Sequence, residues 1–257
     1  MRRAVAVLHP GAMGSRLAAE LRRAGHPVWW VPQGRSAAST RRAADEGLVA
    51  RSWAELAAAE VIVCSCAPQG AVDVARRVAK TDFHGVYVEA NPLSPRSLDS
   101  VVGALGEGVQ LVDAGIIGPP PGIGPATHLV LSGPAAAVQV VADLWETTPV
   151  TPIVAGLQVG QASAAKAAYA LFNKGRIALA VLARSLAAAA EVTDVLTNQS
   201  GRPGADILGD AELETSLREV AWRWGPEFDE IARTLAEHQL SPDVATVLRQ
   251  VWTQLDE

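Results

Sequence analysis

Residues 4–18 read AVAVLHPGAMGSRLA, a short apolar run followed at once by a glycine-containing turn and a helical pattern. In the dinucleotide-binding fingerprint one glycine makes the tight turn, a second lets backbone amides approach a diphosphate, and a third lets the helix pack closely on the strand. Gly11 and Gly14 take the second and third positions, and His9 takes the first. We therefore predict a diphosphate-binding turn at the start of this helix. The residues expected to contact the cofactor there are His9, Pro10, Gly11, Ala12, Met13 and Gly14.

Two readings of this turn remain open. The strand-to-helix context supports nucleotide binding, but a tight turn in a sheet protein that binds no nucleotide has the same local pattern. His9 is interpreted as a turn residue near the ligand rather than as a catalytic group.

Strand-like runs alternate with helical patterns through the first 157 residues. Strands are expected at residues 4–8, 28–31, 61–66, 86–90, 109–114 and 128–131, and helices at residues 11–24, 39–47, 70–79 and 94–105. The early runs are continuously apolar, which is typical of parallel strands covered on both faces. This pattern predicts an α/β fold with a Rossmann-like, doubly wound, mostly parallel sheet.

The chain after residue 157 predicts a smaller all-α domain. An Ala-rich segment at residues 161–191 is expected to be one long helix between the domains, and residues 209–257 to form two or three more. Ser241-Pro242-Asp243 is a start signal for the last helix. We therefore predict two domains, 1–157 and 158–257, the second for substrate binding and dimerisation.

Composition excludes several classes of function. Of 257 residues, 49% are apolar, and 22 Lys and Arg stand against 27 Asp and Glu, so neither disorder nor nucleic-acid binding is expected. No signal-peptide core or membrane-spanning run is found in the sequence. Cys64 and Cys66 are expected to point to opposite faces of a strand and form no bridge, which indicates a reducing cytoplasm. The His and Cys residues show no metal-ligand spacing, so no metal site is predicted.

The end of the second expected strand indicates which dinucleotide is bound. An acidic residue there would hold the ribose hydroxyls of NAD, but residues 31–36 read VPQGRS and contain no carboxylate. Gly34, Arg35 and Ser36 are instead predicted to accept a 2′-phosphate, with Arg41 or Arg42 as further candidates or as solvated helix residues. NADP is therefore the expected cofactor, with NAD as the less favoured alternative.

Five segments in order resemble motifs of the β-hydroxyacid dehydrogenase superfamily, which includes 3-hydroxyisobutyrate dehydrogenases, 6-phosphogluconate dehydrogenase and imine reductases. They are GAMG at 11–14, VIVCSCAP at 61–68, EANPLSP at 89–95, DAGIIGP at 113–119 and GQASAAK at 160–166. The chain is most similar to a little-characterised bacterial subgroup with a compact helical C-terminal domain.

The resemblance implies roles for residues in these segments. It implies cofactor contacts at Cys66, Ala67 and Asn91, and a catalytic lysine at Lys166. It implies a substrate loop at Gly115, Ile116, Ile117 and Gly118. It also implies a homodimer whose C-terminal helices contribute to the partner's cleft. Ile117 stands where the family has Ser, and Ala170 where it has Asn, which departs from the pattern for a short hydroxy acid.

Helical spacing puts Lys166, Tyr169 and Asn173 on one face of the long helix. Lys166 is predicted to transfer the proton, with Asn173 holding the reacting atom and Tyr169 as a reserve acid. The alternative is a lysine that extends from an Ala-rich helix to solvent.

These residues together predict an NADPH-dependent oxidoreductase. It would transfer a hydride between nicotinamide and a small carbonyl, imine or β-hydroxy acid substrate. The alternative function is a catalytically inactive NADP-binding scaffold or sensor.

Overall fold

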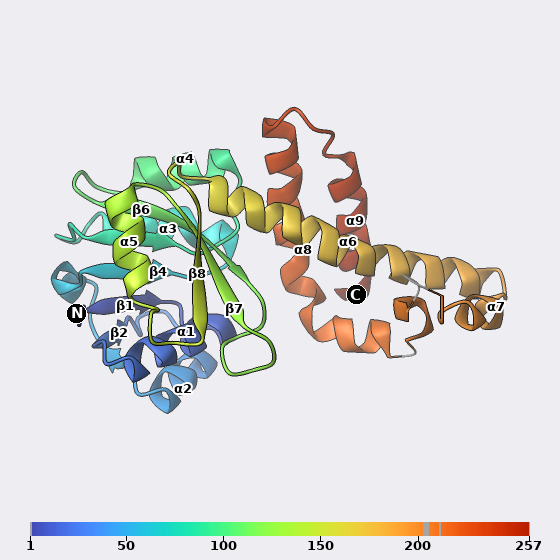
Figure 1. The fold of residues 1–257 in the computed structure, drawn as a ribbon, viewed down its shortest axis with the longest axis horizontal. Coiled ribbons are helices and arrows are strands. Elements are labelled where there is room, and N and C mark those ends of the chain that lie inside the picture. The colour runs from blue at the N-terminus through green and yellow to red at the C-terminus, as the bar shows by residue number, and fades with distance from the viewer. Residues whose placement is uncertain (1, 203–205, 211, 257) are drawn as a thin grey trace. The chain divides into compact units, whose positions relative to one another are not determined.

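A computed structural model describes residues 2–202, 206–210 and 212–256 (Figure 1). The chain divides into two compact units, Met1–Lys166 and Ala167–Glu257. This division falls nine residues after the predicted end of the first domain, inside a long helix. The predicted boundary at residue 157, between a cofactor-binding domain and a substrate-binding domain, stays a prediction.

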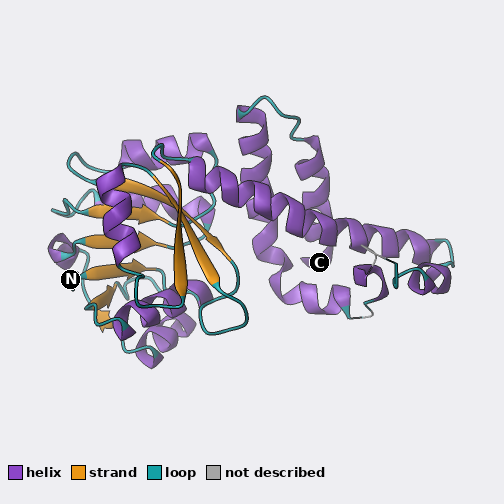
Figure 2. Ribbon diagram, in the orientation of Figure 1, coloured by secondary structure: helices purple, strands orange, loops and turns teal. Residues whose placement is uncertain are grey.

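The first unit is built on one eight-stranded sheet (Figure 2). Its strands are β1 (Val5–Leu8), β2 (Val28–Trp30), β3 (Val49–Ala50), β4 (Val61–Cys64), β5 (Val86–Glu89), β6 (Gln110–Ile117), β7 (Thr127–Ser132) and β8 (Val150–Gly156). Their spatial order is β3-β2-β1-β4-β5-β6-β7-β8, and every neighbouring pair is parallel except β6 and β7. The prediction of a mostly parallel, Rossmann-like sheet is confirmed.

Helices cover both faces of this sheet. They are α1 (Ala12–Arg23), α2 (Ala37–Asp45), α3 (Ala71–Val78), α4 (Pro95–Ala104) and α5 (Ala135–Asp143), with short 3₁₀ turns at η1 (Ala54–Ala58) and η2 (Pro68–Gly70). Val5 and Val7 of β1 share one buried cluster with residues of α1, α2 and α5. Ala6 and Leu8 share the other cluster with residues of α3 and α4. Alternate residues of one strand therefore supply two separate cores, which explains the continuous apolar runs.

Two strands were missed, and one extends further than expected. β3 contains only two residues, both exposed. β8 contains Pro152, which reads as a turn in sequence but is tolerated here because β8 is an edge strand. β6 continues through Ile117, so Gly115, Ile116 and Ile117 lie in a strand, and the prediction that they form a loop was wrong. Their pairing with the antiparallel β7 extends the strand.

The second unit is helical throughout its described part. α6 (Gln161–Ala189) starts in the first unit, and α7 (Thr193–Asn198), η3 (Asp206–Gly209), α8 (Leu213–Glu237) and α9 (Asp243–Asp256) follow. Phe228 and Trp252 are fully buried in its core, and Trp224 meets Trp252 edge-on at 4.8 Å between ring centroids. The predicted all-α region and the start of the last helix at Asp243 are confirmed. Within the described ranges, no helix is both long enough and apolar enough to cross a membrane.

Candidate functional site

One row of paired residues crosses four neighbouring parallel strands, at the carboxyl ends of three of them and in the middle of β6. Leu8 pairs with Cys64, Cys64 with Glu89, and Glu89 with Asp113. At about 4.8 Å between strands, the row spans about 14 Å. In open α/β sheets, ligands bind at this edge. The row therefore brings the segments that follow β1, β4, β5 and the middle of β6 to one edge.

The turn after β1 brings the start of α1 close to the end of β4. His9 adopts a φ of +63°, the left-handed conformation that glycine adopts more readily, so the chain turns here without a glycine. A Cβ on Gly14 would overlap Ser65 Oγ and lie 3.0 Å from the His9 carbonyl oxygen, so glycine favours this close packing of α1. A Cβ on Gly11 would meet only the His9 carbonyl, at 4.0 Å, which leaves open space for a ligand.

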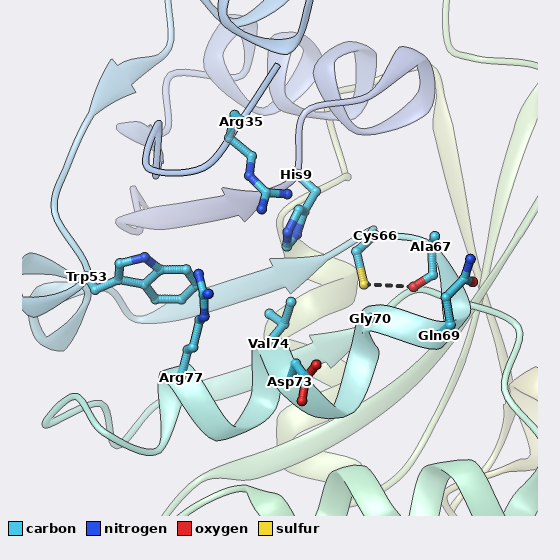
Figure 3. A pocket seen from close by; sticks show the side chains of 10 residues that line it. All are labelled: His9, Arg35, Trp53, Cys66, Ala67, Gln69, Gly70, Asp73, Val74 and Arg77. Atoms are coloured by element: carbon cyan, nitrogen blue, oxygen red, sulfur yellow. Dashed lines mark hydrogen bonds between the residues drawn. The ribbon is translucent and has the colours of Figure 1, made fainter.

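A cavity of about 350 Å³ opens beside this turn (Figure 3). Its lining residues are His9, Arg35, Trp53, Cys66, Ala67, Gln69, Gly70, Asp73, Val74 and Arg77. Four of the predicted cofactor contacts, His9, Arg35, Cys66 and Ala67, are therefore brought together. They come from the ends of β1, β2 and β4, which lie far apart in sequence.

The cavity has a positive electrostatic character. Burial, with the nearby guanidinium groups of Arg35 and Arg77, lowers the pKa of His9 to about 4, so His9 is neutral at physiological pH. The Arg77 guanidinium also lies 5.6 Å from the centre of the Trp53 ring. The acidic lining residue Asp73 pairs with Arg76 at 3.0 Å. Two cations next to a neutral imidazole favour an anionic ligand.

The other predicted cofactor residues have different positions. Gly11 is the N-cap of α1, and Ala12, Met13 and Gly14 form its first turn, after Pro10. Gly34 has a φ of +76° in the turn before Arg35. The Ser36 hydroxyl caps α2 by accepting a hydrogen bond from Ser39 N at 3.2 Å. A capping role fixes the direction of α2 without requiring a ligand.

Asn91 lies behind the cavity wall rather than in it. Its buried amide donates to Cys64 Sγ at 3.8 Å, to Cys66 Sγ at 3.5 Å, and to the carboxylate of Glu89. The two sulfurs are 3.7 Å apart, and both cysteines are free. The prediction that they point to opposite faces was wrong, because residues two apart in an extended chain share a face.

Asp113 joins the sheet to the long helix α6. Its buried carboxylate accepts hydrogen bonds from Ser132 Oγ at 3.1 Å, Gly160 N at 3.0 Å, Ser163 N at 2.8 Å and Ser163 Oγ at 2.5 Å. Burial raises the pKa of Asp113, while these hydrogen bonds act in the opposite direction. A carboxylate at a helix N-terminus satisfies its free amide groups and favours its dipole. Asp113 therefore fixes where α6 begins.

Lys166 lies at the end of this anchored turn. A Cβ on Gly115 would lie 2.8 Å from Lys166 Cβ and 3.0 Å from the Ala162 carbonyl, so glycine is needed for α6 to approach β6 here. Lys166 is half-buried, and burial lowers its pKa to about 8. An amine with this pKa is present in both protonation states near neutral pH. Gly115 and Lys166 are thus side by side, two residues past Asp113 along β6.

The remaining predicted residues lie further along β6 and α6. Ile116 and Ile117 are half-buried, and Gly118 has a φ of +109°, where a Cβ would lie 2.7 Å from the Ala126 carbonyl. Tyr169 and Asn173 belong to the second unit, where the Asn173 amide donates to the Tyr169 carbonyl at 3.3 Å. Tyr169 is 45% exposed.

Sequence reasoning missed several residues of this site. Trp53 and Arg77 carry no local signal, because a tryptophan near a turn and an arginine on a helix match no binding motif. Asp113 had a signal: it is a carboxylate inside an apolar strand pattern, and such a residue requires hydrogen-bonding partners when buried.

Comparisons with known proteins agree with this geometry. Residues 4–88 match the sequence profile of the family described as NADP oxidoreductase, coenzyme F420-dependent. No curated protein matches the chain in sequence. A conserved protein of unknown function, reported as structurally similar to 3-hydroxyacid dehydrogenases, is 26% identical with a TM-score of 0.72, covering 98% of this chain and 96% of that one.

Two enzymes of known activity share the fold at lower identity. Mycobacterium tuberculosis 3-hydroxyisobutyrate dehydrogenase with L-serine is 17% identical, with a TM-score of 0.76 and coverage of 99% and 94%. A reductive aminase from Aspergillus terreus, in complex with NADPH and ethyl-5-oxohexanoate, is 16% identical, with a TM-score of 0.60 and coverage of 99% and 93%. The profile match and these folds agree with the resemblance inferred from the motifs: in residues 4–88 and in its fold, the chain is similar to the β-hydroxyacid dehydrogenase-like superfamily.

Proposed function

We propose that this protein is an NADPH-dependent oxidoreductase that acts on a small carbonyl, imine or β-hydroxy acid. The family profile and the fold support the coarser conclusion, an oxidoreductase that uses a nicotinamide cofactor. The finer conclusion, which names NADPH and the substrate class, rests on one observation. Lys166 lies next to Gly115, at the same edge of the sheet as the cavity lined by Arg35 and Arg77.

The chain's own residues fit a dinucleotide. The open space beside Gly11 admits a diphosphate that a side chain would exclude. The first turn of α1 contains no acidic residue, and no side chain within the described part of the structure caps it, so its amide groups favour an anion. The diphosphate would therefore lie on residues 11–14, with the adenosine half directed toward the cavity at Arg35.

Arg35 and Arg77 support NADP over NAD. A 2′-phosphate carries up to two negative charges, which the two guanidinium groups that line this cavity would bind by charge-assisted hydrogen bonds. The Trp53 ring, which lines the same cavity, offers a flat surface for adenine.

Lys166 is proposed as the proton donor in reduction and the acceptor in oxidation. The nicotinamide, when bound, supplies or takes up the hydride. The Lys166 ammonium would donate its proton to the reacting oxygen or nitrogen, and its pKa of about 8 lets the amine recover a proton from solvent. Asn173 and Tyr169 are proposed to orient the reacting atom and to serve as a reserve acid.

The residues after Asp113 favour a less polar substrate. Ile117 and Ala170 stand where the family has Ser and Asn, polar groups that would position a carboxylate or hydroxyl, and Ile116 adds to the apolar wall. We therefore favour reduction of a carbonyl or imine, while the anchored Lys166 keeps β-hydroxy acid oxidation as the related alternative.

The homodimer and a cytoplasmic location are also proposed. Four exposed apolar residues of α6, Phe172, Leu179, Leu182 and Leu186, recur at helical spacing and form an apolar stripe. A second copy of the chain would bury this stripe, and its helices would then reach the partner's cleft.

The test is NADPH consumption against ketones, 2- and 3-oxo acids and cyclic imines, with Lys166→Ala and the exposed-lysine control Lys80→Ala. We expect turnover with at least one class, lost in Lys166→Ala and kept in Lys80→Ala. Tight NADPH binding without turnover on any substrate would instead support the scaffold or sensor function. Failure to bind any nicotinamide dinucleotide would overturn both.

A further inference from the structure

Three potential metal ligands meet beside the glycine turn. They are one ring nitrogen of His9, after β1, and the sulfurs of Cys64 and Cys66, at the end of β4. These atoms all lie within 4.8 Å of one another. No sequence spacing indicates the cluster, because the pairing of β1 with β4 brings His9 to the two cysteines.

The distances suit a tetrahedral ion. Zinc binds thiolate sulfur at about 2.3 Å and imidazole nitrogen at about 2.0–2.1 Å, so tetrahedral angles require about 3.8 Å between two sulfurs and about 3.6 Å between sulfur and nitrogen. The two sulfurs already lie 3.7 Å apart. Rotation of the His9 ring by about 1 Å at its nitrogen would complete this arrangement.

The surroundings of the cluster favour ligation. Among the described residues, His9 Nδ1 is buried and has no hydrogen-bond partner. A ring nitrogen without a partner is available to a metal ion with no existing hydrogen bond to break. The Asn91 amide points at both sulfurs, and a hydrogen bond of this kind stabilises and orients a thiolate ligand.

Binding requires the loss of two thiol protons. A bound divalent ion deprotonates its thiol ligands outright, and two protons would pass to solvent. The resulting unit of one divalent ion and two thiolates carries no net charge.

We propose that His9, Cys64 and Cys66 bind one zinc-class, thiophilic divalent ion, whose fourth position faces the cavity. His9 and Cys66 line the cavity, and Cys64 is buried, so a water molecule or an anion in the cavity can reach the ion. Three protein ligands with one open position are the arrangement of catalytic zinc sites. This proposal does not depend on the oxidoreductase function.

The experiment is a Zn²⁺ titration of the whole chain, reduced with a phosphine, in competition with a chromophoric chelator. We expect one ion per chain in the wild type. His9→Gly and Cys66→Ser should each weaken Zn²⁺ binding at least about 100-fold. This is more than is typical for loss of a residue that only hydrogen-bonds to a metal ligand. His84→Gln, which changes an exposed histidine beside Asp82, should bind like the wild type.

The variants are chosen so that misfolding does not imitate lost binding. Glycine relieves the left-handed conformation of residue 9, and serine is nearly isosteric with cysteine, so thermal unfolding of the metal-free variants should match the wild type. Co²⁺ gives a second readout, because thiolate-to-cobalt absorption should appear in the wild type and fall in Cys66→Ser. Absence of this absorption in the wild type, or equal Zn²⁺ affinity in all four proteins, would overturn the proposal.

Discussion

The carboxylate of Asp113 accepts a hydrogen bond from the Ser163 hydroxyl at 2.5 Å, and thereby ties strand β6 to the first turn of helix α6. The Ser163 amide donates to the same carboxylate at 2.8 Å, so the contact fixes both the position and the direction of the turn. Lys166 lies three residues further along α6. Its place beside Gly115 therefore depends on the buried Asp113 carboxylate, two residues before Gly115 along β6.

Ser163→Ala tests this dependence. Loss of one charge-assisted hydrogen bond should lower the free energy of unfolding by about 1.5–3 kcal/mol. It should lower kcat severalfold through the displaced Lys166 and leave the Kd for NADPH unchanged. Chemical denaturation, steady-state kinetics and cofactor titration measure the three effects. Ser100→Ala, which removes an exposed hydroxyl bonded to the Arg96 carbonyl, is the matched control. Equal kcat values in both variants would contradict a positioning role.

Arg35→Ala tests the choice of dinucleotide. Because Arg35 is proposed to bind the 2′-phosphate, its loss should weaken NADPH binding about 10- to 100-fold, about 1.4–2.8 kcal/mol, and NADH binding by much less. Fluorescence titration with each dinucleotide measures this difference. Arg218→Ala, which removes an exposed guanidinium of α8, is the control. Equal losses for both dinucleotides would refute the 2′-phosphate assignment.

The pH dependence of reduction tests Lys166. Burial lowers the Lys166 pKa to about 8, and reduction requires the ammonium form, so kcat/KM should fall as pH rises through about 8. Lys166→Ala should lose activity at least about 100-fold, and Lys166→Arg should lack the alkaline decline because a guanidinium stays protonated. The profiles are measured under saturating NADPH. An unchanged decline in Lys166→Arg would assign it to another group.

Glu89→Gln tests whether the buried carboxyl group of Glu89 has a raised pKa. Burial, with Cys64 and Asp113 nearby, raises the pKa of Glu89 well above its ordinary value. The folded protein therefore holds this proton more tightly than the unfolded chain. The stabilisation is fully present below the unfolded pKa and is lost as pH rises through the folded pKa, at up to about 1.4 kcal/mol per pH unit.

Glutamine stays neutral, so the variant should gain stability relative to the wild type as pH rises from about 4 toward neutral and alkaline values. Denaturation across this range measures the difference. Glu107→Gln, at an exposed position, should follow the wild type. A difference between wild type and Glu89→Gln that does not change with pH would contradict the raised pKa.

Substitutions in the apolar stripe of α6 test the proposed homodimer. Phe172 is 71% exposed and Leu186 is 70% exposed, and their separation of 14 residues corresponds to about 21 Å of helix. Glutamate at either position should convert the dimer into a monomer without unfolding the chain, because both side chains are already exposed. Light scattering after size-exclusion chromatography measures the mass. Val102→Glu, an exposed apolar position of α4, should leave the mass unchanged.

Local patterns were sufficient to predict most of the architecture. The apolar runs, the glycine turn and the start signal at Asp243 all depend on residues adjacent in sequence, and the corresponding elements formed as expected. Errors arose where neighbours in space override local preference. Pro152 lies in a strand because β8 is an edge, and β6 extends past Gly115 because β7 pairs with it.

The amino-acid order alone determined the fold class and the prediction of a dinucleotide turn, since both depend on residue type and short-range spacing, and the family resemblance of residues 160–166 supplied the candidate role of Lys166. The folded chain was needed to bring Arg77 and Trp53 to Arg35, His9 to the two cysteines, and Asp113 to Ser163. The physical reason is that parallel strands align their carboxyl ends through hydrogen bonds between distant segments. Those alignments determine which side chains line the same cavity, which of them shift one another's pKa, and which could bind one ion together.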